Sequence, residues 1–374
     1  MIDYIRKIIK PKYDTINVVE LSAKNLLDNI SFIQSKQQKA EIIAVLKSNA
    51  YGHGLKEIAT ILNKSSVKMV AVDSYPEAQI VYKYFKGKVL ILSEMPIDAY
   101  RYTKINRTEF VVYRSETLKY LSKYGKKAKV HLFYNSGMNR EGFSSVEGFV
   151  SSNKEYLDKV TVNGFCSHLA SADSKSELNA VQESKFIAAY QKLLTLGYKP
   201  KHVHLGNSAG LFILKNDIYT AFRTGLSIYG FSPFKYEINE LKPVLEVKSK
   251  IMHSQVIEKG ENVSYNETYV SDGRRNIALV PFGYFEGLDW RLSGKIKLEV
   301  LKDKESYFAS IAGRICMNIL CLDLNNNSYK DGTVIRVVSA NNKHSNSVLN
   351  ISQYTDGIYQ TLVKINPGIR RKIV

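Results

Sequence analysis

The chain has 374 residues, of which 44% are hydrophobic and 24% charged, and these fractions exclude a disordered or fibrous protein. Lys and Arg number 53 against 35 Asp and Glu, which gives a formal net charge of +18. The lysines are scattered, and no helix-turn-helix, zinc-finger or RNA-binding signature accompanies them. The charge therefore predicts a solvated basic surface and no nucleic-acid partner.

Cysteine usage and the N-terminal residues indicate the compartment. The chain has three cysteines, a small and odd number that does not suit a disulfide framework. Residues 1–13 are broken by charges and lack the apolar core of a signal peptide. No apolar run approaches the roughly 20 residues that a membrane helix needs. We therefore expect a soluble, cytoplasmic protein with no membrane partner.

From about Glu41 to Ile228, short apolar runs alternate with amphipathic stretches. The runs predict eight strands, at 41–46, 67–72, 88–93, 109–113, 128–134, 160–165, 201–205 and 220–224. The stretches between them predict helices at 55–63, 76–85, 115–125 and 177–197. Strands that are apolar along their length suit a parallel sheet buried on both faces, so the pattern favours an α/β fold with a (β/α)₈ TIM barrel. A doubly wound open sheet is the alternative, because the pattern alone cannot close a barrel.

After Pro233 the pattern changes to strands with little helix between them. Strand-like runs follow at 244–260, 276–285, 295–303, 305–320 and 332–339. We therefore predict a barrel domain over residues 1–245 and a C-terminal, mostly β domain over residues 246–374.

The segment 44–54, AVLKSNAYGHG, places Lys47 directly after an apolar strand. Barrel enzymes carry catalytic groups at this edge, and a buried lysine with a lowered pKa can form a Schiff base with an aldehyde cofactor. A strand-ending surface lysine with a solvated head is the alternative when Lys47 is considered alone.

The whole segment resembles the cofactor-lysine motif of the alanine racemases, the fold-type III enzymes that use pyridoxal 5′-phosphate (PLP). Further motifs of that family recur in the same order at 136–143, 167–173, 204–210, 222–233, 241–251, 263–269, 281–287 and 313–318. The resemblance implies a barrel with a C-terminal β domain and an enzyme that interconverts L- and D-alanine, supplying D-alanine for peptidoglycan.

The resemblance implies two catalytic bases on opposite faces of the substrate Cα, Lys47 and Tyr265. One base removes the proton from one face while the other returns it on the opposite face, so the substrate need not turn over. The family also implies that Tyr265 acts in the partner subunit's site, which predicts a homodimer with shared active sites.

The other site residues also follow from the resemblance. Arg223 resembles the arginine that faces the pyridine nitrogen, and because it stays protonated it disfavours protonation of that nitrogen. His168 resembles a residue packed against the cofactor ring, although a core histidine is the alternative. The implied phosphate contacts are Tyr51, Ser208, Gly225, Leu226 and Tyr354. The implied substrate contacts are Arg140 and Met317, with Asp173, Arg291 and Arg314 at the substrate entrance.

The sequence departs from the family at two positions. Phe133 stands where many members have a carbamylated lysine that holds the arginine, so another group must orient Arg140, and Asn135, a water or a chloride are candidates. Asn318 stands where the family usually has Asp. These changes keep open a broad-specificity or serine racemase, and a PLP-binding protein without turnover is a further alternative. His202 and His204 share a strand face, but they lack a third ligand at a telling spacing, so no metal site is predicted.

Overall fold

The computed structural model describes residues 15–302 and 305–374, which divide into two compact units. The barrel unit is Ser22–Val244, and the β unit joins the described residues up to Leu21 to Leu245–Val374. The predicted domain boundary assigned residues 1–21 to the barrel, but the first strand pairs with strands of the β unit. The N-terminal residues that argued against a signal peptide lie outside the described residues. No helix within the described ranges is long and apolar enough to cross a bilayer.

The barrel unit is built on an eight-stranded parallel sheet in the order β8-β7-β6-β5-β4-β3-β2-β9. Every predicted run forms one strand: β2 (Glu41–Val45), β3 (Met69–Val72), β4 (Lys88–Ile91), β5 (Thr108–Val112), β6 (Lys129–Phe133), β7 (Thr161–Cys166), β8 (His202–His204) and β9 (Ala221–Thr224). The strands at the two ends of this order are also joined, because Thr220 N–H donates to Val203 O (3.0 Å) and Arg223 N–H donates to Gly206 O (3.0 Å). These bonds close the sheet into a barrel and exclude the open sheet.

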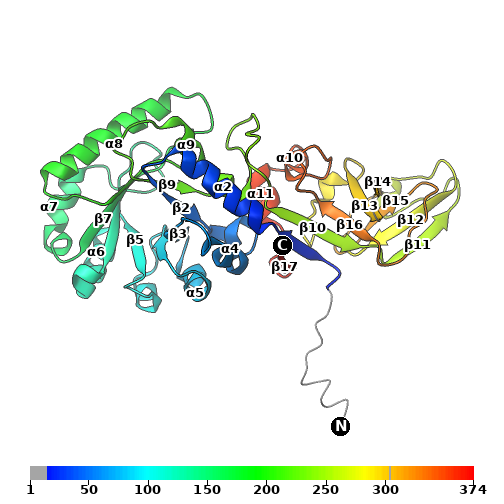
Figure 1. Cartoon of the computed structure of the whole chain (residues 1–374), viewed down its shortest axis with the longest axis horizontal. Coiled ribbons are helices and arrows are strands. Elements are labelled where there is room, and N and C mark those ends of the chain that lie inside the picture. The colour runs from blue at the N-terminus through cyan, green and yellow to red at the C-terminus, as the bar shows by residue number, and fades with distance from the viewer. Residues whose placement is uncertain (1–14, 303–304) are drawn as a thin grey trace, which may run out of the picture. The chain divides into compact units, whose positions relative to one another are not determined.

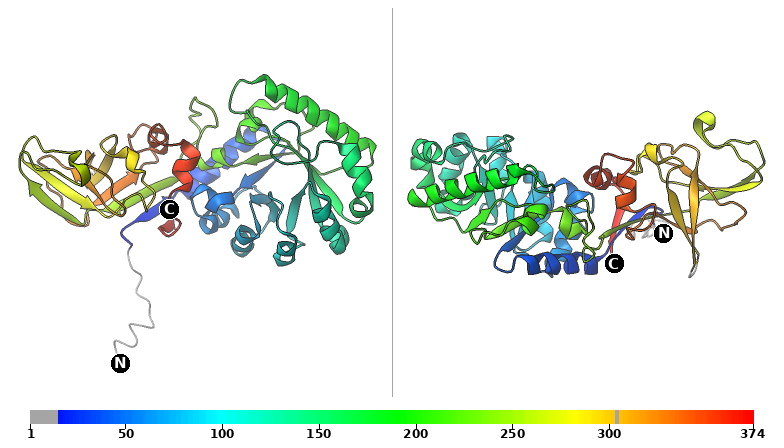
Figure 2. Two further views of the ribbon diagram at one scale, coloured as in Figure 1. Left: turned by 180° about the vertical axis from the view of Figure 1, so that it is seen from behind. Right: turned by 90° about the horizontal axis from the view of Figure 1, so that it is seen from above.

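Helices surround the barrel strands (Figures 1 and 2). They are α2 (Ala23–Lys36), α3 (Lys47–Tyr51), α4 (Leu55–Leu62), α5 (Tyr75–Tyr84), α6 (Ser115–Leu121), α7 (Val146–Leu157), α8 (Glu177–Thr195) and α9 (Ser208–Ile213), with the 3₁₀ helices η1 (Ile97–Tyr102), η2 (Ser122–Lys127) and η3 (Leu226–Tyr229). The hydroxyls of Ser22, Ser145 and Ser176 accept backbone N–H groups at the starts of α2, α7 and α8. Pro76 lies in the first turn of α5, where its missing N–H costs nothing.

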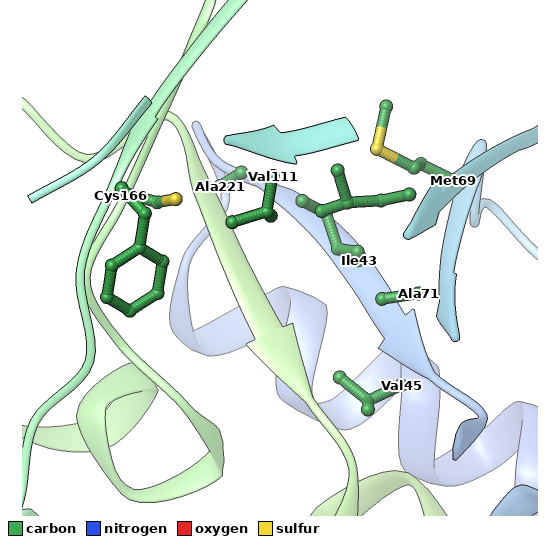
Figure 3. Packing of buried hydrophobic residues seen from close by; sticks show 9 residues of the cluster. Ile43, Val45, Met69, Ala71, Val111, Cys166 and Ala221 are labelled. Atoms are coloured by element: carbon green, nitrogen blue, oxygen red, sulfur yellow. The ribbon is translucent and has the colours of Figure 1, made fainter. Parts of the chain in front are cut away.

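The apolar part of the barrel interior consists of side chains that alternate along the strands. Figure 3 shows that Ile43, Val45, Met69, Ala71, Val111, Cys166 and Ala221 come from several strands and gather in one cluster. Successive residues of a strand face opposite sides of the sheet. Since Val111, Phe133 and Ala221 belong to this interior cluster, the residues two positions away in the same strands also face inward. Those residues, Glu109, His131 and Arg223, are charged or polar and at most 6% exposed.

The β unit contains a nine-stranded sheet in the order β11-β12-β15-β14-β13-β16-β10-β1-β17. Its strands are β1 (Val18–Leu21), β10 (Leu245–Lys250), β11 (His253–Ile257), β12 (Arg275–Val280), β13 (Lys297–Lys302), β14 (Glu305–Ala312), β15 (Leu320–Asp323), β16 (Val334–Val338) and β17 (Arg370–Ile373). All pairs are antiparallel except β1 with β17. Short helices interrupt the strands: η4 (Tyr265–Glu267), η5 (Trp290–Leu292), α10 (Val348–Ser352) and α11 (Ile358–Val363).

Candidate active site

Eight of the predicted site residues lie in the barrel unit, at or near the carboxyl ends of its strands. Arg223 lies in β9, and the others follow β2, β6, β7, β8 or β9. The eight residues are Lys47, Tyr51, Arg140, His168, Ser208, Arg223, Gly225 and Leu226. The carboxyl ends of parallel strands meet at one rim of a barrel, which is where active sites of this fold are built. The fold therefore brings these eight residues to a single rim.

Lys47 begins a turn of unusual backbone conformation. The next four residues, Ser48–Tyr51, have φ values of 56°, 54°, 54° and 52°, which is the left-handed region, although none of them is glycine. This conformation costs roughly 1–2 kcal/mol per residue for an L-amino acid. Asn49 holds the turn, because its N–H donates to Glu77 Oε1 (3.2 Å) and its side-chain oxygen accepts Leu55 N–H (2.9 Å). Lys47 itself is partly exposed.

The left-handed turn directs Tyr51 toward the loop after β9. A Cβ atom added at Gly225 would lie 2.6 Å from Tyr51 Oη, so the absence of a side chain at 225 makes room for this hydroxyl. The Ser208 hydroxyl accepts N–H groups from Gly225 (3.2 Å) and Ser227 (3.3 Å). Among the described residues, the buried hydroxyls of Thr224 and Ser227 have no hydrogen-bond partner. Several hydroxyl and N–H groups thus lie close to Gly225 in the sequence or in space, a composition that suits an anion such as phosphate.

Arg223 is the buried cation of the rim and is 6% exposed. Its guanidinium donates to the carbonyls of Ser167 (2.5 Å), His204 (2.7 Å) and Leu205 (3.2 Å), as well as to the His204 side chain. It also donates to His168 Nδ1 (3.2 Å). These hydrogen bonds, which the guanidinium donates to three carbonyls and two imidazoles, hold it in one orientation.

His168 accepts from Arg223 at Nδ1, so its Nε2 carries the proton in the neutral imidazole. Burial lowers the pKa of His168 to about 3, and the positive charges of Arg223, Arg140 and Lys47 add to this shift. The imidazole is therefore neutral at physiological pH. This neutral ring lies beside the guanidinium and is influenced by all three cations of the rim.

Arg140 is not held by Asn135, one of the candidates suggested from the sequence. Asn135 Oδ1 accepts the N–H groups of Gly137 (3.0 Å) and Asn139 (3.0 Å), so this side chain shapes the loop. The guanidinium of Arg140 donates instead to Glu141 Oε1 at 2.7 Å. Sequence reasoning did not single out Glu141, although an acidic residue next to an arginine at a barrel rim was a usable signal.

Phe133, which replaces the family's lysine, packs into the barrel interior. It is 8% exposed, and its ring meets the ring of Tyr113 edge-on with centroids 6.3 Å apart. An apolar side chain at this position removes any charge that could reach Arg140 from β6.

Tyr265 lies in the β unit on a turn that is held in a strained conformation. Ser264, Asn266 and Glu267 have φ values of 67°, 63° and 50°. The Ser264 hydroxyl donates to Arg314 O (2.7 Å), which ties the turn to the loop after β14. Tyr265 projects from this turn with 68% of its surface exposed. A strained turn that presents an exposed aromatic side chain is a frequent feature of functional sites.

A pocket of about 550 Å³ lies in the β unit near this turn. Its lining includes Tyr354 and three cations, Arg291, Lys295 and Arg314. Arg291 donates to Asp356 (2.8 Å), Arg314 lies over the Trp290 ring at 5.2 Å, and Lys295 lies over the Tyr354 ring at 5.5 Å. The pocket therefore combines basic and aromatic side chains, and two of the expected entrance residues, Arg291 and Arg314, line it.

The remaining predicted residues lie on the surface of the two units. Met317 is 56% exposed in the loop between β14 and β15, and its carbonyl accepts Phe285 N–H at 2.9 Å. Asn318 donates to Glu286 Oε1 (3.1 Å), and Asp173 is exposed on the barrel unit. Within the described ranges, no group of three His, Cys, Asp or Glu side chains is arranged to hold a metal.

Comparison with known proteins shows the family of the chain. Residues 21–233 match the model of the alanine racemase N-terminal domain, and residues 244–373 match that of the C-terminal domain. An alanine racemase of Lactobacillus acidophilus is 30% identical, with 93% of this chain and 94% of that protein aligned.

Two solved structures extend the likeness to three dimensions. The alanine racemase of Clostridium difficile 630 superposes with a TM-score of 0.86 at 27% identity, covering 97% of both chains. The structure of the alanine racemase from Bacillus anthracis with bound L-Ala-P superposes with a TM-score of 0.83 at 25% identity, covering 97% of this chain and 96% of that one. The two family models together span nearly the whole sequence and agree with the barrel and the β unit, and the chain therefore belongs to the alanine racemase family.

Proposed function

We propose that this protein is a PLP-dependent alanine racemase that interconverts L- and D-alanine. The observation that carries the proposal is the barrel rim, where an amine (Lys47), a buried cation (Arg223) and an anion site around Gly225 converge. Membership of the family and the L-Ala-P bound to a relative support the same substrate class. The D-alanine would serve peptidoglycan synthesis, and the small, odd number of cysteines supports a cytoplasmic enzyme.

The residues around Gly225 fit the phosphate group of PLP. Two buried hydroxyls without partners in the described structure, those of Thr224 and Ser227, flank this position. A buried hydroxyl without a hydrogen bond is costly, and a phosphate oxygen would accept from it. We propose that Tyr51, Ser208, Gly225 and Leu226 hold the phosphate, with Tyr354 as a further contact, and that His168 packs against the ring.

PLP bound at Lys47 would supply an electron-withdrawing ring that acidifies the Cα–H bond of an amino acid joined to it. The protein's part is to place bases and charges around that bond. Lys47 would hold or release a proton on one face of Cα, and Tyr265 would do so on the other. Arg223 keeps its positive charge, so it would disfavour a proton on the ring nitrogen and limit side reactions.

We propose that the enzyme is a homodimer in which Tyr265 and Met317 contribute to the partner's site. Both side chains are more than half exposed, at 68% and 56%, and Phe285 and Trp290 of the β unit are exposed to similar extents. Exposed apolar and aromatic side chains gathered in one unit are typical of surfaces that another protein covers. Arg140 would hold the substrate carboxylate, and Glu141 of the same subunit would fix the orientation of the Arg140 guanidinium.

One observation favours a second candidate on the same scaffold. Phe133 and the Arg140–Glu141 pair give this chain a different arrangement around the expected carboxylate contact. A broad-specificity or serine racemase would use the same bases with such an altered substrate side.

The test is an absorbance spectrum of the purified protein, followed by chiral analysis after incubation with L-alanine, L-serine, L-lysine and L-arginine separately. We expect a PLP spectrum and formation of D-alanine at the highest rate. Lys47→Ala should lose both the spectrum and the activity. A higher rate with another amino acid would favour the second candidate, and a yellow protein that racemises none of them would indicate a binding protein without turnover.

A further inference from the structure

A chain of buried polar side chains runs through the interior of the barrel from β5 to β9. Glu109 Oε2 lies 2.8 Å from His131 Nε2, and His131 Nδ1 lies 2.7 Å from His204 Nε2. His204 Nδ1 in turn is hydrogen-bonded to Arg223 Nη1. The four residues are between 0% and 6% exposed, so water does not reach the bonds between them.

The chemistry of the groups assigns a direction to every bond in this chain. A guanidinium has only donors, so Arg223 donates to Nδ1 of His204. His204 must then carry its proton on Nε2 and donate to Nδ1 of His131. His131 must in turn carry its proton on Nε2 and donate to the carboxylate of Glu109. The donors thus all point from a buried cation to a buried anion through two neutral imidazoles.

The charge states agree with this direction. Burial alone would raise the pKa of Glu109, but its interactions with His131 and Asn163 lower it to about 2, so the carboxylate is ionised. Burial and the charge of Arg223 hold the pKa of His204 well below its usual range, so that imidazole is neutral. The Glu109 carboxylate and the His204 imidazole are therefore in the states that their hydrogen bonds require.

The Glu109 end of the chain is anchored by other groups. Asn163 donates to Glu109 Oε2 (2.5 Å), and Lys129 Nζ lies 3.9 Å from Oε1. The ring of His131 occupies space that only a glycine on β7 leaves free, because a Cβ added at Gly164 would lie 2.2 Å from His131 Nδ1. His202 stacks on His131 with ring centroids 5.6 Å apart, but it enters none of the chain's hydrogen bonds.

The buried positive charge of Arg223 must be compensated, and the hydrogen-bonded side chains that lead to Glu109 can do this. A buried charge is unfavourable unless it is paired and hydrogen-bonded. No carboxylate of the described structure contacts the Arg223 guanidinium, whose other partners are carbonyls and the imidazole of His168. Glu109 supplies the compensating negative charge at a distance, and the two imidazoles transmit it as aligned dipoles.

We propose that Glu109, His131 and His204 are positioning residues, which hold the buried guanidinium of Arg223 in one orientation through a directed chain of hydrogen bonds. The consequence for catalysis rests on the proposed function, in which Arg223 faces the PLP ring nitrogen. The orientation and charge of Arg223, and with them the electron demand of the ring, then depend on a carboxylate three hydrogen bonds away.

The first test uses the wild-type protein and needs no activity. Proton–nitrogen NMR of the ¹⁵N-histidine-labelled protein at pH 7, assigned with single-histidine variants, reports which ring nitrogen carries the proton. We expect His131 and His204 to be neutral with the proton on Nε2, both with and without PLP. A proton on Nδ1 of either ring, or a doubly protonated His204, would overturn the proposal whatever the enzyme's activity.

The second test compares Glu109→Gln, which removes the charge at constant shape, with His202→Phe, which changes a buried ring outside the chain. Glu109→Gln should shift the Nε2 resonances of both chain histidines, change the absorbance spectrum of bound PLP and lower kcat about tenfold at nearly constant KM, the effect of losing one charge-assisted hydrogen bond. His202→Phe should leave the PLP spectrum unchanged and kcat within about twofold, because this change keeps an aromatic ring against His131 and removes none of the three hydrogen bonds that lead to Arg223.

The outcomes separate the two proposals. If Glu109→Gln matches His202→Phe in PLP spectrum and kcat, the positioning role is wrong even though the wild-type enzyme racemises alanine. If the wild-type protein neither binds PLP nor racemises an amino acid, the proposed function fails. The NMR result alone then decides whether Glu109, His131 and His204 position Arg223.

Discussion

Replacement of Gly225 by alanine tests the anion site at the barrel rim. Gly225 has a φ of −112°, so alanine brings no backbone strain, and the effect of Gly225→Ala is steric. The added Cβ would lie 2.6 Å from Tyr51 Oη, and ordinary contact begins at 3.4 Å, so the hydroxyl must move by about 0.8 Å. Tyr51 cannot easily retreat, because its ring packs against the buried Tyr229 at 5.3 Å.

The magnitude follows from what the displaced hydroxyl does. Overpacking a well-packed position costs about 1–3 kcal/mol of folding free energy. A lost hydrogen bond to a charged group costs about 1.5–3 kcal/mol, which corresponds to roughly 10- to 150-fold weaker binding of PLP. The assay is a fluorescence titration of the PLP-free protein with PLP, combined with thermal unfolding without PLP.

A matched control lies on α9 of the same rim. The Cβ of Gly210→Ala would meet nothing closer than 3.5 Å, and this variant should bind PLP within about twofold of the wild-type protein, because the added methyl makes only ordinary contacts. If Gly225→Ala and Gly210→Ala bound PLP equally well, the phosphate would not lie at Gly225 and the reasoning would be refuted.

Three further predictions concern the second base, its turn and the effect of pH. Tyr265→Phe should keep the PLP spectrum but lower two-way racemisation by at least about 100-fold, the usual effect of removing a base, and wild-type rates in a chiral assay would remove Tyr265 from the mechanism. In Gly313→Ala, the new Cβ would lie 2.1 Å from Val263 O at a φ of +69°, which displaces the turn that carries Tyr265. Its kcat should fall about 10- to 100-fold with unchanged PLP affinity, and an unaltered kcat would show that the turn does not position the base. Burial lowers the pKa of His202 to about 4, and interactions with His131 and Asn163 outweigh burial and lower the pKa of Glu109 to about 2. Both groups therefore bind protons more readily in the unfolded chain, so the free energy of unfolding is highest above about pH 6.5 and falls as the pH drops. The expected loss is about 3 kcal/mol for His202 between about pH 6.5 and 4, and a similar amount for Glu109 between about pH 4.5 and 2. Urea unfolding at pH 7.5 and pH 5 would detect the first loss, and equal free energies at the two values would contradict it.

The eight barrel strands could be predicted because most of them are short, largely apolar runs that are buried on both faces. The closure of the sheet could not be predicted from the pattern, since it depends on hydrogen bonds between β8 and β9, the two ends of the strand order. The helix α7 was missed because its sequence, VEGFVSSNKEYL, has few apolar residues and several polar ones in succession. The strands β1 and β17 were missed because they pair with each other across the whole length of the sequence, which no local pattern indicates.

Much of the candidate site could be located from motifs, but its shape could not. Ser48–Tyr51 contains no glycine, so nothing in the sequence indicates four successive residues in the left-handed region. His202 and His204 were weighed as a metal pair, whereas the structure pairs His204 with His131 and Arg223. A usable signal was present, because polar residues at alternate positions of otherwise apolar strands must find partners inside a barrel.

The most direct test of the central claim is borohydride reduction of the PLP-loaded protein, followed by proteolysis and peptide mass spectrometry. We expect the reduced cofactor to be fixed to Lys47 and to no other lysine, and we expect Lys47→Ala to carry none. Recovery of the cofactor on a different lysine, or of an unlabelled Lys47 peptide from a protein that racemises alanine, would contradict it.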